Sequence, residues 1–403
     1  MNLFTKSIFT SLLPCAAVSA QGLYSIAPND DEASSSLPLT YIVGASIGFD
    51  NNPTPLTPGN DGSLYIEPHI QANWTSVSPQ TTWDVYARLG VRFYFEDVEV
   101  GDADQQDYNV RAGVNFTHRF NERLRFSSRN FVGYETEPDF NFGFGNDRRS
   151  GNYFRYSTDN SIGYRWSDRL GTQTGINFSG AIFDDLDDVD YNRFTLRHSF
   201  RYRVSPATVL TTSYRYTNTF SDSASGDSNS HFVTGGVEHR FSPNNAIVLR
   251  AGIQVTDPDN GSVRTQPFIE AALRSQLTQQ LSTNVFVRWS NETFNRSLID
   301  GAGTQQVFEE SDTLRIGAKA TYALNPRVSV FGGVNYIRTD YEEPDNVDSF
   351  EGDENLVNLN IGASYQLNSN LYLTGSYNYT RAISDFDREY NRSRFQLGVQ
   401  ATF

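Results

Sequence analysis

The stretch Arg394-Phe-Gln-Leu-Gly-Val-Gln-Ala-Thr-Phe403 places an apolar side chain at every second position. The apolar positions are Phe395, Leu397, Val399, Ala401 and Phe403, and polar residues or glycine stand between them. Successive side chains of a β-strand point to opposite faces, so a period of two predicts a strand with one apolar and one polar face. We therefore expect the last ten residues to separate an apolar medium from a polar one.

The rest of the chain, from Leu39 onward, repeats this pattern in pairs of alternating segments. In the clearest pair the tight turn is Ser78-Pro-Gln80, and Pro68 predicts a β-bulge because proline has no amide hydrogen to donate. Eight tight turns are predicted, at 78–80, 121–123, 167–169, 205–207, 242–245, 278–280, 325–327 and 368–370. With an opening strand at 40–50 and the closing strand, they predict eighteen strands.

Soluble sandwiches and propellers also alternate in this way, so strand length and aromatic placement decide between the two classes. The predicted strands of ten to fourteen residues suit a membrane, which a tilted strand crosses in about 9–11 residues. Large aromatic residues near the strand ends, on the apolar face, are typical of an interfacial girdle. They are Trp74, Trp83, Trp166, Trp289, Phe120, Phe200 and Phe241.

These features predict an all-β fold, a transmembrane antiparallel up-and-down β-barrel of about 18 strands. Its periplasmic turns would be short and its extracellular loops long, as in 135–151, 291–310 and 339–354. The composition, with 38% hydrophobic residues and a mean hydropathy of −0.50, excludes a polytopic helical membrane protein. The formal net charge of −15 argues against a nucleic-acid partner.

Residues 1–20 have the features of a secretory signal peptide, with Lys6 before an apolar stretch and Val18-Ser-Ala20 at its end. Leu12-Leu-Pro-Cys15 also has features of a lipoprotein cleavage site, which Pro14 fits poorly. Cleavage after Ala20 would remove the only cysteine, so we expect neither disulfides nor a thiolate metal site. Residues 21–38 are expected to form a polar leader and residues 39–403 the barrel.

The polar face of each strand would line the lumen, and basic residues outnumber acidic ones there. The predicted pore-lining basic residues are Arg88, Arg92, Arg111, Arg155, Arg197, Arg201, Arg215, Arg250, Arg288, Arg315 and Lys319. The predicted pore-lining acidic residues are Glu67, Asp84, Asp159, Glu238 and Glu270. A cationic lining favours anions.

Two other interpretations of the polar face remain open. The arginines could instead pair with loop carboxylates or with carboxylates on neighbouring strands. The inward tyrosines could form a path for sugars, although tyrosine is also an ordinary strand residue. These tyrosines are Tyr65, Tyr86, Tyr94, Tyr153 and Tyr372.

One part of the outward face, within residues 124–182, is polar rather than apolar. It comprises Ser128, Asn130, Thr158, Asn160, Thr172 and Thr174. Because polar groups facing lipid are unfavourable unless covered, the pattern predicts a contact with another copy of the chain. A face-swapping β-bulge is the alternative. Catalysis is not expected, since no histidine lies nearby on that face except His118 or His198 at its rim.

The closing strand, with its final Phe403, resembles the C-terminal signal by which the barrel-assembly machinery recognises bacterial outer-membrane barrels. The hairpin Phe200-Arg-Tyr-Arg-Val-Ser-Pro-Ala-Thr208, with its arginines beside a Ser-Pro turn, resembles hairpins of the β-barrel porin 2 family. This likeness of pattern covers residues 39–403.

The resemblance implies a porin-like barrel without catalytic residues, cofactor or metal, in the outer membrane of a Gram-negative-type bacterium after Sec-dependent export. Its surroundings would be lipid and lipopolysaccharide. The implied function is passive diffusion of small hydrophilic, and by the argument above anionic, solutes. The alternatives are a barrel linked to exopolysaccharide export, and a structural or adhesive barrel whose loops plug the lumen.

Overall fold

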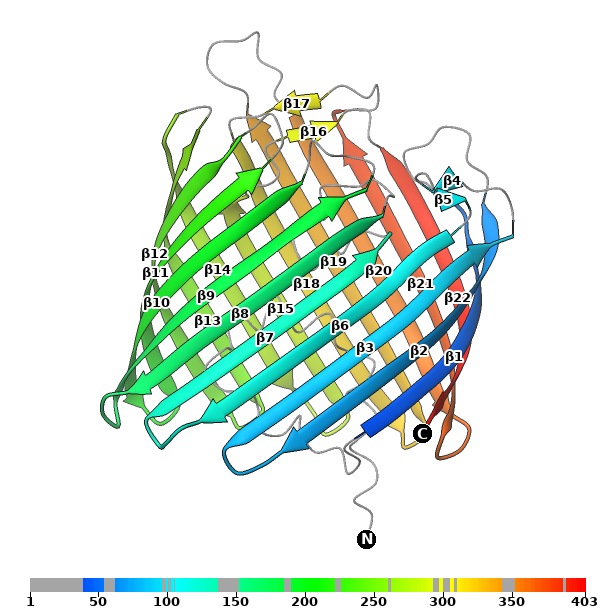
Figure 1. The fold of residues 1–403 in the computed structure, drawn as a ribbon, viewed down its shortest axis with the longest axis horizontal. Coiled ribbons are helices and arrows are strands. Elements are labelled where there is room, and N and C mark those ends of the chain that lie inside the picture. Colours follow the sequence, from blue (N-terminus) through cyan, green and yellow to red (C-terminus); the bar gives the residue numbers. More distant parts are fainter. Residues whose placement is uncertain are drawn as a thin grey trace.

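The fold is one closed antiparallel sheet of eighteen strands that forms a barrel (Figure 1). A computed structural model describes residues 39–53, 62–95, 99–100, 103–104, 106–136, 152–184, 190–221, 226–259, 262–292, 297–299, 305–307, 310–342, 352–386 and 389–403. No helix within these ranges is long and apolar enough to cross a membrane. The eighteen-stranded barrel predicted from the sequence is confirmed.

The barrel strands follow one another in chain order as neighbours. They are β1 (Leu39–Asp50), β2 (Ser63–Val77), β3 (Thr81–Tyr94), β6 (Gln106–Arg119), β7 (Leu124–Glu135), β8 (Tyr153–Arg165), β9 (Leu170–Phe183), β10 (Tyr191–Ser205), β11 (Thr208–Ser221), β12 (Ser228–Ser242), β13 (Asn245–Pro258), β14 (Arg264–Gln276), β15 (Leu281–Asn291), β18 (Glu310–Asn325), β19 (Val328–Glu342), β20 (Gly352–Gln366), β21 (Leu371–Ser384) and β22 (Tyr390–Thr402).

Four short strands form two small sheets outside the barrel wall. They are β4 (Glu99–Val100) with β5 (Ala103–Asp104), and β16 (Ser297–Ile299) with β17 (Gln305–Val307). Both lie at the end opposite the tight turns, at the top of Figure 1. The segment predicted as a plain loop at 291–310 therefore contains a short hairpin, and β19 and β20 extend into the loop predicted at 339–354.

Pairing of the first and last strands closes the barrel. β1 runs antiparallel to β22 from Ile42 opposite Thr402 to Asp50 opposite Arg394. At the other end Tyr41 and Phe403 exchange two backbone hydrogen bonds, of 3.0 and 2.8 Å. Closure gives every edge amide of these strands a partner, which is required where no water can supply one. The pairing predicted for residues 394–403 is confirmed.

The tight turns owe their shape to short polar side chains that cap the backbone. The Oδ1 atom of Asn121 accepts hydrogen bonds from the amides of Arg123 and Leu124, and Asn325 and Asn368 repeat this arrangement in their own turns. The register shifts lie beside three of these turns, for example between Arg203 and Ser205. The bulge predicted at Pro68 is wrong, because the β2–β3 ladder resumes beyond it in the same register.

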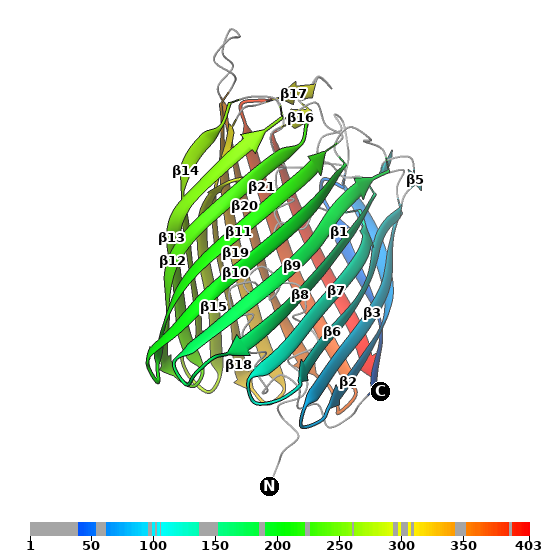
Figure 2. The same cartoon turned by 60° about the vertical axis from the view of Figure 1, so that its left-hand side comes forward.

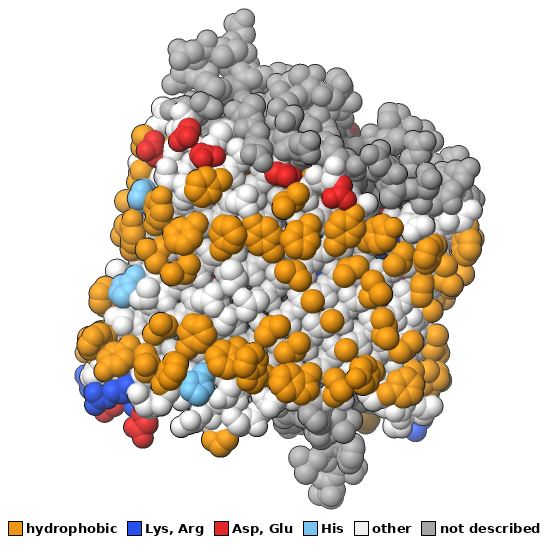
Figure 3. Space-filling view, viewed as in Figure 1, with side chains coloured by type: hydrophobic (Ala, Val, Ile, Leu, Met, Phe, Trp, Pro, Cys, Tyr) orange, Lys and Arg blue, Asp and Glu red, His pale blue; other side chains and the backbone are white. Residues whose placement is uncertain are grey.

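Hydrophobic side chains cover the outside of the barrel in two belts (Figure 3). The predicted girdle residues all lie on this exposed surface, from Trp83 at 37% to Phe241 at 63% exposure. Viewed from another side, the strands keep the same steep tilt around the barrel (Figure 2). The outward alternation thus leaves most charged and polar members of the strands on the inner wall, apart from the polar patch on β7 and β8.

Candidate functional site

Ion pairs organise the inner wall of the barrel, and most of them join neighbouring strands. Nearly all predicted pore-lining basic residues take part. The pairs are Arg88 and Arg92 with Glu67, Arg111 and Arg155 with Glu135, Arg197 with Asp159, Arg201 with Glu238, Arg250 with Glu238 and Glu270, and Arg288 and Arg315 with Glu292. The wall therefore follows the pairing interpretation for most of its arginines.

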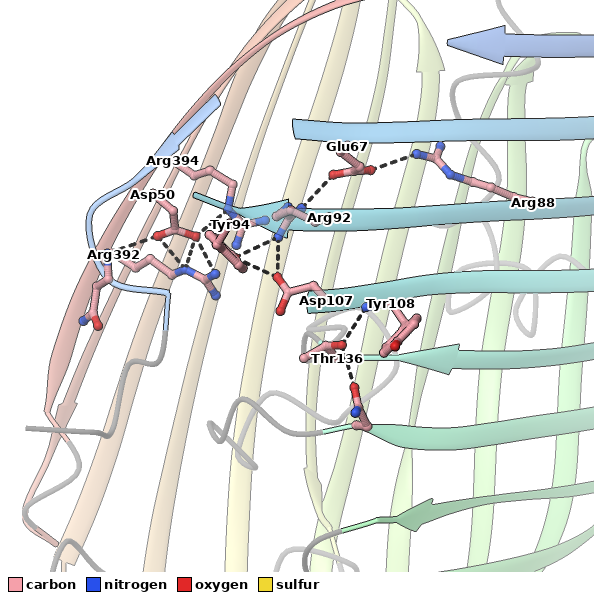
Figure 4. A network of polar contacts seen from close by, with 12 residues as sticks. Asp50, Glu67, Arg88, Arg92, Tyr94, Asp107, Tyr108, Thr136, Arg392 and Arg394 are labelled. Carbon is pink, nitrogen blue, oxygen red and sulfur yellow. Dashed lines mark hydrogen bonds and ion pairs between the residues drawn. The ribbon is translucent and has the colours of Figure 1, made fainter. Parts of the chain in front are cut away.

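Another buried cluster lies at the barrel seam, where β1 pairs with β22 (Figure 4). Asp50, at the end of β1, is fully buried and accepts hydrogen bonds from Arg392 at 2.5 Å and from Arg394 at 3.1 Å. Both arginines belong to β22, so the cluster forms only when the barrel closes. Because a buried charge is costly without a partner, this cluster fixes the register of the first and last strands.

A second cluster continues along β2, β3 and β6 in the same view (Figure 4). Arg92 lies between two carboxylates, 2.9 Å from Glu67 and 2.8 Å from Asp107. The Tyr94 hydroxyl donates to Asp107 at 2.8 Å, and the Arg92 guanidinium stands 4.7 Å from the centre of the Tyr65 ring. Each charge in this cluster thus has an opposite charge and a hydrogen bond.

Two ion pairs reach over an intervening strand. Arg197 on β10 contacts Asp159 on β8 at 2.5 Å, across β9. The position of β9 opposite Arg197 is Gly175, where an added Cβ would lie 2.6 Å from the Arg197 Nε atom. The missing side chain therefore allows this contact. Arg201 likewise reaches Glu238 across β11, with hydrogen bonds of 2.6 and 2.5 Å.

Glu292 stands one residue beyond β15 and accepts two arginines. Arg315 contacts it at 2.5 Å and Arg288 at 2.8 Å. These two arginines lie opposite each other on β15 and β18, so Glu292 also offsets their mutual repulsion. Burial raises the pKa of the Glu292 carboxyl, but the charges of Arg315 and Arg288 outweigh burial and hold the pKa below its ordinary value.

The remaining predicted wall residues have different surroundings. Asp84 accepts hydrogen bonds from Thr75 and Asn115 at 3.3 and 3.0 Å. Lys319 lies on β18 opposite Asn284 and Gly333. Arg215 is the exception to the pairing rule, because it has no hydrogen bond or ion pair within the described ranges.

Four of the five inward tyrosines are buried, and only Tyr86 is partly exposed. Tyr65, Tyr94, Tyr153 and Tyr372 are each less than 5% exposed. Tyr65 and Tyr94 pack against each other edge to face, with ring centres 5.8 Å apart. A sugar that stacks on aromatic rings needs accessible ring faces, and these four do not offer them.

The strongest partners of the arginines were not among the predicted site residues. Asp50, Asp107, Glu135 and Glu292 hold arginines, as described above, yet each stands at or just beyond a strand end. A signal for Asp50 was present in the sequence, since pairing 40–50 with 394–403 brings it beside Arg394. The others depend on strand ends that alternation does not locate.

The outward polar residues form one hydrogen-bonded patch on β7 and β8. Thr158 donates to the Oδ1 atom of Asn130 at 2.7 Å, and Asn130 donates to Ser128 at 3.0 Å. Asn160 donates to the Oγ1 atom of Thr158 at 2.8 Å. The alternative of a face-swapping bulge is wrong, because the β7–β8 and β8–β9 ladders run without a register shift.

The comparisons with known proteins concern the barrel. Residues 247–403 match the family model described as outer membrane protein beta-barrel domain. The match indicates an outer-membrane β-barrel. No curated protein matches the chain. No group of three His, Cys, Asp or Glu side chains in the described ranges could hold a metal ion.

Several solved structures match most of this chain at low sequence identity. OpdK from Pseudomonas aeruginosa is 9% identical with a TM-score of 0.47, and the alignment covers 91% of this chain and 99% of that one. OccAB4 from Acinetobacter baumannii is 11% identical with a TM-score of 0.43, at the same coverage. The ferric enterobactin receptor PfeA from Pseudomonas aeruginosa is 8% identical with a TM-score of 0.43, covering 90% of this chain and 80% of that one.

Proposed function

We propose that the protein is a porin-like channel for passive diffusion of small hydrophilic solutes across the outer membrane, with a preference for anions. The observation that carries the proposal is the division of each strand into a lipid-suited outer face and a charged inner wall. About five outward apolar side chains per strand, each contributing roughly 1.5–3 kcal/mol when removed from water, favour a bilayer. The resemblance to the β-barrel porin 2 family supports the same function.

The preference for anions rests on the arginines that remain in excess over carboxylates. Among the described residues, the single carboxylates Glu135 and Glu292 each contact two arginines, and this local excess of arginine supports the preference. Guanidinium groups in the wall attract anionic solutes, and they keep their positive charge over the ordinary pH range. Neutralisation by pairing makes the expected preference moderate rather than absolute.

The test is single-channel recording in planar bilayers with the full chain after signal cleavage. We expect open conductance steps. In a KCl gradient, the reversal potential should have the sign expected for a channel that prefers chloride over potassium. A folded barrel that inserts but never conducts would contradict the channel and favour a plugged structural barrel. Conductance that arises only after the long loops are removed would favour gated export, the alternative linked to exopolysaccharide.

A further inference from the structure

Arg215, on the inner face of β11, is an arginine held by aromatic rings instead of carboxylates. Its guanidinium carbon stands 3.6 Å from the centre of the Phe232 ring and 5.2 Å from that of Phe268. The two rings meet edge to face, 5.6 Å apart, and are 6% and 3% exposed. Arg215 as a whole is half-buried: its Nε atom is buried, whereas its two terminal nitrogens remain within reach of the lumen.

The two rings come from strands that are not neighbours in the sheet. Phe232 belongs to β12 and Phe268 to β14, so β13 runs between them. Gly252 is the residue of β13 directly opposite Phe268, and an added Cβ there would collide with backbone atoms of Val233. The position of β13 beside Phe268 therefore carries no side chain, whereas Gln254 lies opposite Phe232. Stacking on the two rings limits the rotation of the guanidinium before any ligand binds.

The charges around Arg215 favour an anion. The groups that act on it are Glu270 and the arginines Arg288, Arg250 and Arg193. Glu270, the one carboxylate among them, lies 3.5 Å from Arg250 and shares its charge with that residue. On β11 itself the neighbouring inward residues Ser213 and Thr217 are uncharged. Arg215 has no hydrogen bond to any described residue, and a guanidinium with unoccupied donors is suited to bidentate binding of two oxygen atoms.

We propose that Arg215, held on Phe232 and Phe268, binds the oxyanion group, a carboxylate or a phosphate, of a small solute in the lumen. The proposal deepens the proposed function, on which it rests for access of solutes to the lumen. Arg215 is then the binding residue, and Phe232 and Phe268 are positioning residues. The paired arginines would attract the anion electrostatically from a distance, whereas Arg215 would contact it directly.

The test measures the binding of 4-fluorobenzoate to the folded protein in detergent. The ¹⁹F line width of the ligand reports the binding. We expect broadening that unlabelled acetate or inorganic phosphate reverses, and the more effective competitor identifies the preferred oxyanion. Arg215→Met should weaken binding about tenfold or more, the loss expected for a charge-assisted hydrogen bond. Phe232→Leu should weaken it less, because the charge remains but the ring beneath it is lost.

The matched control is Arg203→Met, which removes an exposed inward arginine near a tight turn of β10. It should leave the broadening unchanged. Equal broadening with wild type and Arg215→Met, or equal broadening of neutral 4-fluorobenzyl alcohol, would overturn the site. Binding without conductance would refute the channel and leave the site standing, whereas conductance without binding would refute the site alone.

The outward polar patch on β7 and β8 independently points to a partner. Asn130 is exposed on the lipid side, near the middle of β7. The Oδ1 atom of Asn160 accepts no hydrogen bond from any described residue. An amide oxygen at mid-bilayer is costly without a donor. We infer that a second copy of the chain covers this patch, since amides carry both donors and acceptors and can pair with their own kind.

Cysteine crosslinking in lipid vesicles tests this contact. Oxidation of Asn130→Cys and Asn160→Cys, singly and together, should give covalent oligomers. Ile253→Cys, on the exposed outer face of β13, is the matched control and should stay monomeric. Monomers from all the variants, or equal crosslinking of the control, would exclude the patch as the contact.

Discussion

Asp50 shows how one residue can determine whether the barrel closes. It is fully buried and is held by two arginines of the last strand. Replacing one partner of a buried ion pair leaves the other charge uncompensated, which costs about 3–5 kcal/mol. Its neighbour Asn51 also joins the last strand, since its Oδ1 atom accepts a hydrogen bond from the amide of Ser393, but it carries no charge.

We predict that Asp50→Asn lowers the free energy of unfolding by about 3–5 kcal/mol, because Arg392 and Arg394 lose their carboxylate. Urea unfolding in detergent, followed by tryptophan fluorescence, measures the change. Asp340→Asn is the matched control, since its pair with Arg338 is exposed and should contribute less than about 1 kcal/mol. Equal losses in the two variants would contradict a special role for the seam.

Glu292 gives a prediction about pH. Its pKa is lowered in the folded state, so the unfolded chain binds the proton more tightly. The stabilisation is therefore complete above the ordinary pKa of a glutamate and is lost as pH falls through the lower folded value. Unfolding at pH 7 and pH 3 should show a smaller loss of stability for Glu292→Gln than for wild type. An identical pH dependence of the two proteins would disprove the assignment.

At the scale of single elements, alternation predicted the faces of the strands and the short turns because both depend on local sequence. The ion pairs could be predicted less well. Arg197 reaches Asp159 over Gly175, a contact that depends on the registers of three strands at once. Such contacts depend on how the strands lie next to one another in the folded barrel, and the spacing of residues along one strand does not reveal this. The bulge predicted at Pro68 was wrong for a related reason. The β2–β3 ladder is interrupted at Pro68, so the proline is accommodated without an extra residue in either strand.

Three strand ends share one arrangement that the sequence only hinted at. His118, His198 and His239 each precede an exposed phenylalanine by two residues and meet its ring edge to face, at 4.6 to 4.9 Å. The Nδ1 atom of each contacts a threonine hydroxyl at 2.8 to 2.9 Å on the neighbouring strand. The spacing was visible in the sequence, but the threonine partners required the register.

The closing element β22 makes a direct prediction. Deleting residues 394–403 would leave the pairing edges of β1 and β21 exposed to hydrocarbon, where each unsatisfied amide costs several kcal/mol. We expect no outer-membrane assembly of the truncated chain, measured by membrane fractionation and by heat-modifiable gel migration. A truncated protein that still inserts and resists heat in detergent would refute this.

The whole molecule adds a prediction about ionic strength. Its anion preference is proposed to arise from the summed charge of the wall, and salt screens such fields over about 10 Å at 0.1 M but about 3 Å at 1 M. The chloride-to-potassium permeability ratio should therefore fall as KCl rises from 0.1 to 1 M. Bilayer reversal potentials at fixed gradient ratio measure it, and a ratio independent of salt would point to contact selection instead.

The seam between β1 and β22 also has a consequence for the order of folding. Every other neighbouring pair of barrel strands is a hairpin, whereas the bonds from Arg392 to Asp50 span 342 residues. Hairpins zip locally and quickly, while a contact between distant residues must overcome the entropy of joining chain ends. We therefore expect the contacts of Asp50 with Arg392 and Arg394 to form last, after the other seventeen strand pairs of the barrel. Formation of the contacts between Asp50, Arg392 and Arg394 therefore marks the completion of the barrel.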